Sequence, residues 1–152
     1  MRITELLDKD SIIADLNASD KKGAIDELAR AAATVTTAPE KQIAEVLMER
    51  EQLGSTGIGG GIAIPHGKLD TVSDITVGFA LSKDGVSYDS LDNKPVHIFF
   101  LLLTPENSTG GHLKVLAQIS KLLKMDQFKS QLLAANSQEE IYDIILEQDE
   151  DF

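Results

Sequence analysis

The sequence predicts an α/β fold, a single-domain sandwich in which a mixed β-sheet is flanked by helices on both faces. Three observations lead to this prediction. Two segments with helical spacing come first, a block of strand-like segments follows, and further helical segments end the sequence. With 152 residues the chain has the usual length of one domain, so we expect residues 1–152 to share one core.

Two N-terminal helices are predicted from apolar spacing and from the residues at their ends. Apolar side chains between residues 24 and 35 recur at helical spacing, and Ser19 or Asp20 can cap this helix. Pro39 suits the first turn of a second helix, which we expect to stop at Gly54.

Strand signals fill the middle of the chain. Residues 62–64 alternate as a short strand, and residues 75–81 alternate as a longer, half-buried one. The pair Asp84-Gly85 predicts a turn that leads to a short strand over residues 86–89. Residues 95–103, PVHIFFLLL, are apolar on both faces, as expected for a central strand covered by helices.

The C-terminal part of the sequence predicts three more helices. One is opened by His112 and carries apolar residues as far as Leu123, and a second surrounds residues 128–133. The last starts at Ser137, which forms a capping box with Glu140. We expect the acidic tail, residues 147–152, to fray.

Composition argues against several classes of partner. Fourteen basic and 25 acidic residues give a net charge of −11, which repels nucleic-acid phosphates and anionic lipid heads. No apolar run approaches the roughly 20 residues that span a bilayer, and the mixed, charged N-terminus is not a signal peptide. The absence of cysteine excludes disulfides and thiolate zinc sites. We therefore expect a cytoplasmic protein with no nucleic-acid partner and no membrane insertion.

The chemically unusual stretch is GIGGGIAIPHG, residues 57–67, which places a histidine behind a run of glycines. Neither frame completes the G-x-G-x-x-G dinucleotide motif, and a P-loop ending at Gly67-Lys68 would need glycine where Ile62 stands. The three histidines lie far apart without metal-ligand spacing. We expect neither a cofactor nor a metal.

A third use of this stretch is a nucleophilic imidazole that accepts a phosphoryl group and passes it on. Pro65 and Gly67 bracket His66 at a strand end, where its ring can stand clear of the sheet. The glycines at residues 57–61 lack side chains and could let a phosphorylated residue of another protein come close.

The segment GSTGIGGGIAIPHGKL resembles the phosphorylation site of enzyme IIA proteins of the bacterial phosphotransferase system. The resemblance is to the fructose–mannitol type (type 2), and it is nearest to the nitrogen-regulatory IIA branch. It extends through MEREQLGSTGIG, DNKPVHIFFLLLTPE, GGHLKVLAQISKLL and SQEEIYDII.

This resemblance implies roles for three residues. His66 would accept phosphate on Nε2 from a phosphohistidine of an HPr-type carrier protein. Arg50, in MEREQ, and His112, in GGHL, would line the pocket around the phosphoryl group.

Each role also has a physical basis and a structural alternative. Arg50 can donate two hydrogen bonds to phosphate oxygens, or simply stabilise a helix C-terminus. His112 follows two glycines at a helix start where free amides bind anions, or it serves as a cap. Ser55 and Thr56 could add hydroxyl donors for phosphate, or act as turn residues. His97 matches no motif and is expected to be structural.

We therefore expect a phosphohistidine phosphocarrier, a phosphotransferase component that signals to target proteins through its phosphorylation state. One alternative is a sugar-specific, fructose/mannitol enzyme IIA that passes phosphate to a IIB domain. A further alternative is a non-catalytic protein-binding module, which would keep the fold without needing His66.

Overall fold

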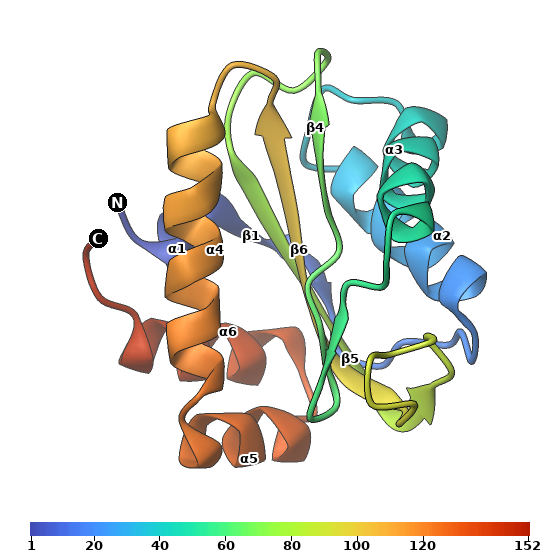
Figure 1. The fold of residues 1–152 in the computed structure, drawn as a ribbon. Helices are drawn as coiled ribbons and strands as arrows, with labels where there is room; N and C mark the ends of the chain where they lie inside the picture. The colour runs from blue at the N-terminus through green and yellow to red at the C-terminus, as the bar shows by residue number, and fades with distance from the viewer.

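Six strands form one mixed sheet between two layers of helices in the computed structural model, which describes residues 1–152 (Figure 1). The strand order is β1-β5-β6-β3-β2, and β4 also pairs with β6. The strands are β1 (Leu7–Ile13), β2 (Gly57–Gly59), β3 (Ile62–Ala63), β4 (His66–Leu69), β5 (Thr76–Val86) and β6 (Val96–Pro105). The predicted α/β sandwich with a mixed sheet is confirmed.

The central strand is β6, as its apolar composition predicts. It runs antiparallel to β5 and parallel to both β3 and β4. β1 pairs in parallel with the edge of β5 that faces away from β6. Alternate side chains of β6 enter opposite cores, with Phe100 on one face and Phe99 on the other. Both faces of this strand are therefore buried.

Helices cover the two faces in separate groups (Figure 1). One face carries α2 (Lys21–Ala33) and α3 (Glu40–Gln52). The other carries α1 (Ile3–Leu6), α4 (Thr109–Leu123), α5 (Asp126–Ala134) and α6 (Gln138–Gln148).

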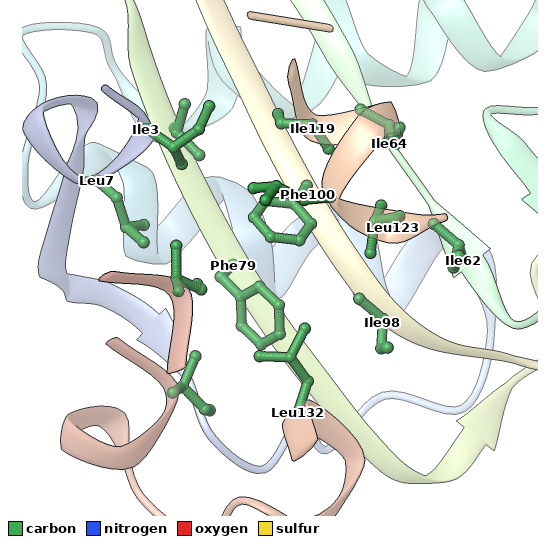
Figure 2. Packing of buried hydrophobic residues seen from close by; sticks show 14 of the residues in the cluster. Ile3, Leu7, Ile62, Ile64, Phe79, Ile98, Phe100, Ile119, Leu123 and Leu132 are labelled. Carbon is green, nitrogen blue, oxygen red and sulfur yellow. The ribbon is translucent and has the colours of Figure 1, made fainter. Parts of the chain in front are cut away.

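The sheet divides the interior into clusters of 20 and 19 buried apolar residues. Figure 2 shows part of the larger cluster, where the rings of Phe79 and Phe100 meet edge to face at a centroid distance of 5.0 Å. Ile119 and Leu123 of α4 and Leu132 of α5 are buried in the same cluster. These contacts attach α4 firmly to the sheet.

Two predicted helix caps are confirmed. The Asp20 carboxylate accepts a hydrogen bond from the Gly23 amide at 2.9 Å, and the Ser137 hydroxyl accepts one from the Glu140 amide at 3.1 Å. In each case a side-chain oxygen satisfies a backbone donor that the first helical turn leaves free.

The predicted turn at Asp84-Gly85, and the separate strand after it, are wrong. β5 continues through this pair to Val86 and pairs with β6 on both sides of it. The register shifts between Leu81 and Val86, Gly85 has φ +91°, and its amide donates to the Ser82 hydroxyl at 3.0 Å. A glycine that adopts positive φ here forms a bulge within the strand, so no reversal of the chain is needed.

Helix α4 begins at Thr109, three residues before the predicted start. Gly110 and Gly111 therefore belong to its first turn, and His112 donates its amide to the Ser108 carbonyl at 2.9 Å. No side chain caps this helix, so the amides before His112 have no side-chain acceptor.

The acidic tail differs from the frayed end that the sequence predicts. Helix α6 extends to Gln148, and the buried Asp149 accepts hydrogen bonds from the amides of Ile3 and Thr4 at 3.1 and 2.8 Å. The Phe152 amide also donates to the Met1 carbonyl at 2.8 Å. Asp149 is held because it satisfies the free amides of α1, a short helix that no sequence signal predicts.

A break at Ile64-Pro65 separates β3 from β4 along the edge of β6. Ile62 lies opposite Ile98 before the break, and His66 lies opposite Leu102 after it. Pro65 has no amide to donate, although its carbonyl accepts from Leu102 at 3.0 Å. The break thus ends regular pairing just before His66.

Close packing of α3 against β4 depends on Gly67. A Cβ atom at this position would lie 2.5 Å from Cγ1 of Val46. We expect Gly67→Ala to lower the free energy of unfolding by about 1–3 kcal/mol, because α3 must shift to make room. Urea denaturation measures the effect, and the loss should shrink in a Val46→Ala background.

Gly110→Ala is the matched control, since a Cβ there meets no atom within 4 Å. It should leave stability unchanged or raise it, because alanine favours a helix. If Gly67→Ala lowered the free energy of unfolding equally in the wild-type and Val46→Ala backgrounds, the packing argument would be contradicted.

Candidate functional site

Three residues from separate segments meet in one cleft. Arg50 lies in the last turn of α3, His66 opens β4, and His112 lies in the first turn of α4. All three line a cleft of about 630 Å³. In Figure 1, β4 lies between the layer of α3 and that of α4. The structure thus brings together the residues for which the sequence predicts the main roles.

The hydrogen bonds of His66 determine which of its ring nitrogens is free. Nδ1 lies 2.8 Å from the carbonyl oxygen of Ile64. A carbonyl can only accept, so Nδ1 carries the proton and Nε2 of the neutral ring has the lone pair. Nε2 accepts from Nε of Arg50 at 3.3 Å. The nucleophilic nitrogen is therefore the one remote from the main chain.

The Arg50 guanidinium lies beside this nitrogen and is held by the end of its own helix. Nη1 donates to the Gly54 carbonyl at 2.9 Å, while Nε points at His66. A guanidinium has five N–H donors, so this arrangement leaves donors for an anion beside His66 Nε2.

The second histidine of the cleft, His112, is neutral at physiological pH. Its ring meets that of His66 edge on, with centroids 5.3 Å apart, and its Nδ1 lies 2.9 Å from the Thr104 hydroxyl. The pKa of His112 is lowered from 6.5 to about 4, chiefly by burial and also by repulsion from His66, when that ring is protonated, and from the Lys68 ammonium. Only 7% of the residue's surface is exposed.

Sequence reasoning missed Lys68, which also lines the cleft. Its ammonium donates to the hydroxyl of Thr109, the first residue of α4, at 2.8 Å. The signal was present, because residues i and i+2 of a strand share a face and Lys68 is two residues after His66. With Arg50, the lysine is thus a second positive charge in the cleft, and it lies beside the first turn of α4.

Two exposed leucines border the same cleft. Leu53 is 85% exposed and Leu113 is 60% exposed, and they follow α3 and His112 respectively. An apolar rim around a polar centre is typical of a surface that another protein covers.

The hydroxyls of Ser55 and Thr56 are not brought to the cleft. Thr56 is buried, and its hydroxyl bonds to the Glu51 carboxylate and to the Tyr88 hydroxyl, the latter at 3.1 Å. The Ser55 hydroxyl accepts from the Gly57 amide at 3.0 Å, as in a turn. Both side chains thus support the loop after α3.

The glycine run also lies away from His66. It forms the β2–β3 hairpin, where the Gly61 carbonyl accepts a hydrogen bond from the backbone amide of His97 at 2.8 Å, near the start of β6. Ile62, which follows it, is about 13 Å of extended chain from His66. The ring of His97 bonds through Nδ1 to the Ser82 carbonyl at 2.8 Å, in keeping with a structural role.

No group of three or more histidine, aspartate or glutamate side chains is arranged to hold a metal ion. Among the helices, none has the length and apolarity that a membrane crossing requires.

Comparison with known proteins identifies the family. Residues 5–148 match the family described as "Phosphoenolpyruvate-dependent sugar phosphotransferase system, EIIA 2". The chain belongs to this family. The resemblance read from the segment around His66 is thereby confirmed, and the chain is a phosphotransfer component of the enzyme IIA type.

Two curated relatives of equal identity differ in length and in name. A nitrogen regulatory protein of Bradyrhizobium diazoefficiens is 40% identical over 145 residues, covering 95% of each chain. The fructose-specific EIIABC component of Bacillus subtilis is also 40% identical, over 150 residues. That match covers 98% of this chain but only 24% of the longer relative.

Solved structures support the same assignment. The nitrogen regulatory protein IIA-Ntr from Neisseria meningitidis aligns with a TM-score of 0.88 and 35% identity, over 94% of this chain and 98% of that one. The mannitol IIA of Escherichia coli aligns with a TM-score of 0.77 over 91% and 97% of the two chains. Its identity of 21% shows the shared fold alone.

The lowered pKa of His112 makes stability depend on pH. The unfolded chain takes up a proton as the pH falls below 6.5, whereas folded His112 does so only near pH 4. Between pH 7 and pH 5, wild type should therefore lose about 2 kcal/mol more unfolding free energy than His112→Gln. Urea denaturation at both pH values tests this, and equal losses would contradict it.

Proposed function

We propose that this enzyme IIA protein is a phosphocarrier that accepts a phosphoryl group on Nε2 of His66 from a phosphohistidine of an HPr-type carrier. It then signals to target proteins through its phosphorylation state. The observation that carries this proposal is the hydrogen bond from Nδ1 of His66 to the Ile64 carbonyl, which leaves Nε2 unprotonated beside the Arg50 guanidinium.

The proposed transfer needs no general base. The lone pair on Nε2 attacks phosphorus while the bond between phosphorus and the donor nitrogen breaks, and its electron pair returns to the donor ring. The proton on Nδ1 stays with its hydrogen bond to Ile64. Because one N–P bond replaces another, the group can be passed on as readily as it is received.

The groups around Nε2 suit a phosphoryl group in transit. Arg50 and Lys68 supply positive charge, and in this structure they donate to the uncharged oxygens of Gly54 and Thr109. These donors can turn toward phosphate oxygens without breaking an ion pair. Since the whole chain carries −11, this local positive charge also marks where an anionic group can approach.

The regulatory role is supported by the relatives that match over nearly their whole length. Nitrogen regulatory proteins of Bradyrhizobium diazoefficiens and Escherichia coli align over 95% and 90% of their own sequences. The proposal includes a cytoplasmic location, where an HPr-type carrier would deliver the phosphoryl group.

The fructose-specific relative supports a second candidate, an enzyme IIA that passes phosphate to a IIB domain for sugar uptake. A solved complex of the Escherichia coli mannitol IIA with phosphorylated IIB, 19% identical to this chain, shows such a partner for that protein. Both candidates use His66 and differ in the acceptor. A binding module that never carries phosphate would not need the tautomer that the Ile64 carbonyl favours at His66.

Replacing His66 should abolish phosphorylation without unfolding the protein. His66→Ala, incubated with enzyme I, an HPr-type carrier and phosphoenolpyruvate, should gain no phosphoryl mass in intact-protein mass spectrometry. His97→Gln is the control, because its ring makes a structural contact outside the cleft, and it should be phosphorylated normally. A phosphoryl group on the His66→Ala variant would move the acceptor to another residue.

Arg50→Ala distinguishes the acceptor from the groups that bind the phosphate. It should slow transfer on the order of a hundredfold, yet the phosphate should still be found on His66. Transfer at the wild-type rate would return Arg50 to a purely structural role at the end of α3.

Phosphorylation should change which proteins bind the face bordered by Leu53 and Leu113. The phosphoryl group adds nearly two negative charges, which a partner covering this face must bury unless it supplies arginines. Immobilised wild type and His66→Ala are compared in pull-downs from cell extract with and without phosphoenolpyruvate. The same bound proteins under every condition would favour the sugar-uptake candidate.

A further inference from the structure

A buried threonine supports the second histidine of the cleft. Thr104 lies near the end of β6, opposite Lys68 of β4, and none of its surface is exposed. Its side chain shares a face of β6 with Leu102, the face that packs against α4. The Thr104 hydroxyl has a single hydrogen-bond partner in the structure, Nδ1 of His112 at 2.9 Å.

The direction of this hydrogen bond follows from the burial of the hydroxyl. A threonine hydroxyl has one proton to donate, and a buried donor without an acceptor is strongly unfavourable. Nδ1 of His112 is its partner in the structure, so the hydroxyl must donate to it. Nδ1 then holds the lone pair, and in the neutral ring the proton resides on Nε2.

The nitrogen that carries this proton is open to the cleft. Nε2 of His112 makes no hydrogen bond within the protein, and it is not among the buried polar atoms that lack a partner. The His112 ring lines the cleft next to His66, so its N–H is available to a group bound there.

We propose that Thr104 is a positioning residue for phosphoryl transfer, which holds His112 as the Nε2–H tautomer so that this N–H donates to an oxygen of the phosphoryl group on His66. This inference rests on the proposed function. The two histidines are thereby held as opposite tautomers, His66 by a hydrogen-bond acceptor and His112 by a hydrogen-bond donor. The Ile64 carbonyl leaves a lone pair on Nε2 of His66, and the Thr104 hydroxyl leaves a proton on Nε2 of His112.

The opposite tautomer of His112 would not serve transfer. With its lone pair on Nε2, the ring would repel the phosphoryl oxygens and would present a second nucleophile beside the first. A neutral donor also holds the phosphoryl group less tightly than a cation would, which suits a group that must leave again. The low pKa of His112 agrees with this role, because it keeps the ring uncharged.

The tautomer can be read directly from the unphosphorylated protein by ¹⁵N NMR of the histidine rings at pH 7. Wild type and Thr104→Ser should both show His112 protonated on Nε2, because serine retains the hydroxyl. Thr104→Val has nearly the same shape without the donor, and it should show the Nδ1–H form appearing. This measurement does not depend on phosphoryl transfer, so it is separate from the failure or success of His66 as acceptor.

Transfer from an HPr-type carrier to His66 provides the second readout. Thr104→Val should slow it on the order of tenfold or more, whereas Thr104→Ser should stay within about twofold of wild type. Slower transfer with an unchanged His112 tautomer would overturn the proposal, because Thr104 would then act through packing alone. Wild-type transfer in Thr104→Val would overturn it as well.

If Thr104→Val fails to fold, the wild-type spectrum still decides. A wild-type His112 protonated on Nδ1 would overturn the proposal, and one protonated on Nε2 would support it.

Discussion

The hydrogen bond between Nδ1 of His66 and the Ile64 carbonyl is the constraint on which the chemistry of the cleft depends. It joins the side chain of His66 to the backbone of the residue two positions earlier, at the break between β3 and β4. Pro65 interrupts the strand between β3 and β4, and Leu102 of β6 positions the chain next to His66, because its amide donates to the Pro65 carbonyl and it lies opposite His66. Because a carbonyl cannot donate, the bond also determines the protonation of the ring.

A buried polar cluster holds the segment that follows Arg50. The Glu51 carboxylate accepts from the Thr56 amide at 3.1 Å and pairs with the Lys21 ammonium at 3.0 Å. Burial and the charge of Glu51 raise the pKa of Tyr88, so its hydroxyl stays protonated beside Thr56. Buried groups that are fully paired define one arrangement of the chain. Here they join the end of α3 to β2 and so help to orient Arg50 toward His66.

Much of the fold could be predicted because its signals are local. The side chains of Asp20 and Ser137 cap helices by accepting from amides three residues further on, and the apolar run within β6 is typical of a central strand. The predicted turn at Asp84-Gly85 failed because the same glycine conformation serves a turn and a bulge, and only pairing with β6 decides between them. Helix α1 and the ordered tail were not predicted, because they stabilise each other through the hydrogen bonds from the amides of Ile3 and Thr4 to Asp149. These residues lie at opposite ends of the sequence, so no local pattern indicates the contact.

For the site, the sequence by itself determined the residue types, since the segment around His66 and its resemblance to enzyme IIA proteins point to His66, Arg50 and His112. Only the tertiary structure decided which hydroxyls and cations accompany them. It turned Thr56 inward to Glu51, placed the glycine hairpin at the start of β6, and brought Lys68 and Thr104 to His66 and His112. The physical reason is that a hydrogen bond between residues on different strands and helices depends on sheet register and helix packing, which no local pattern of residues encodes.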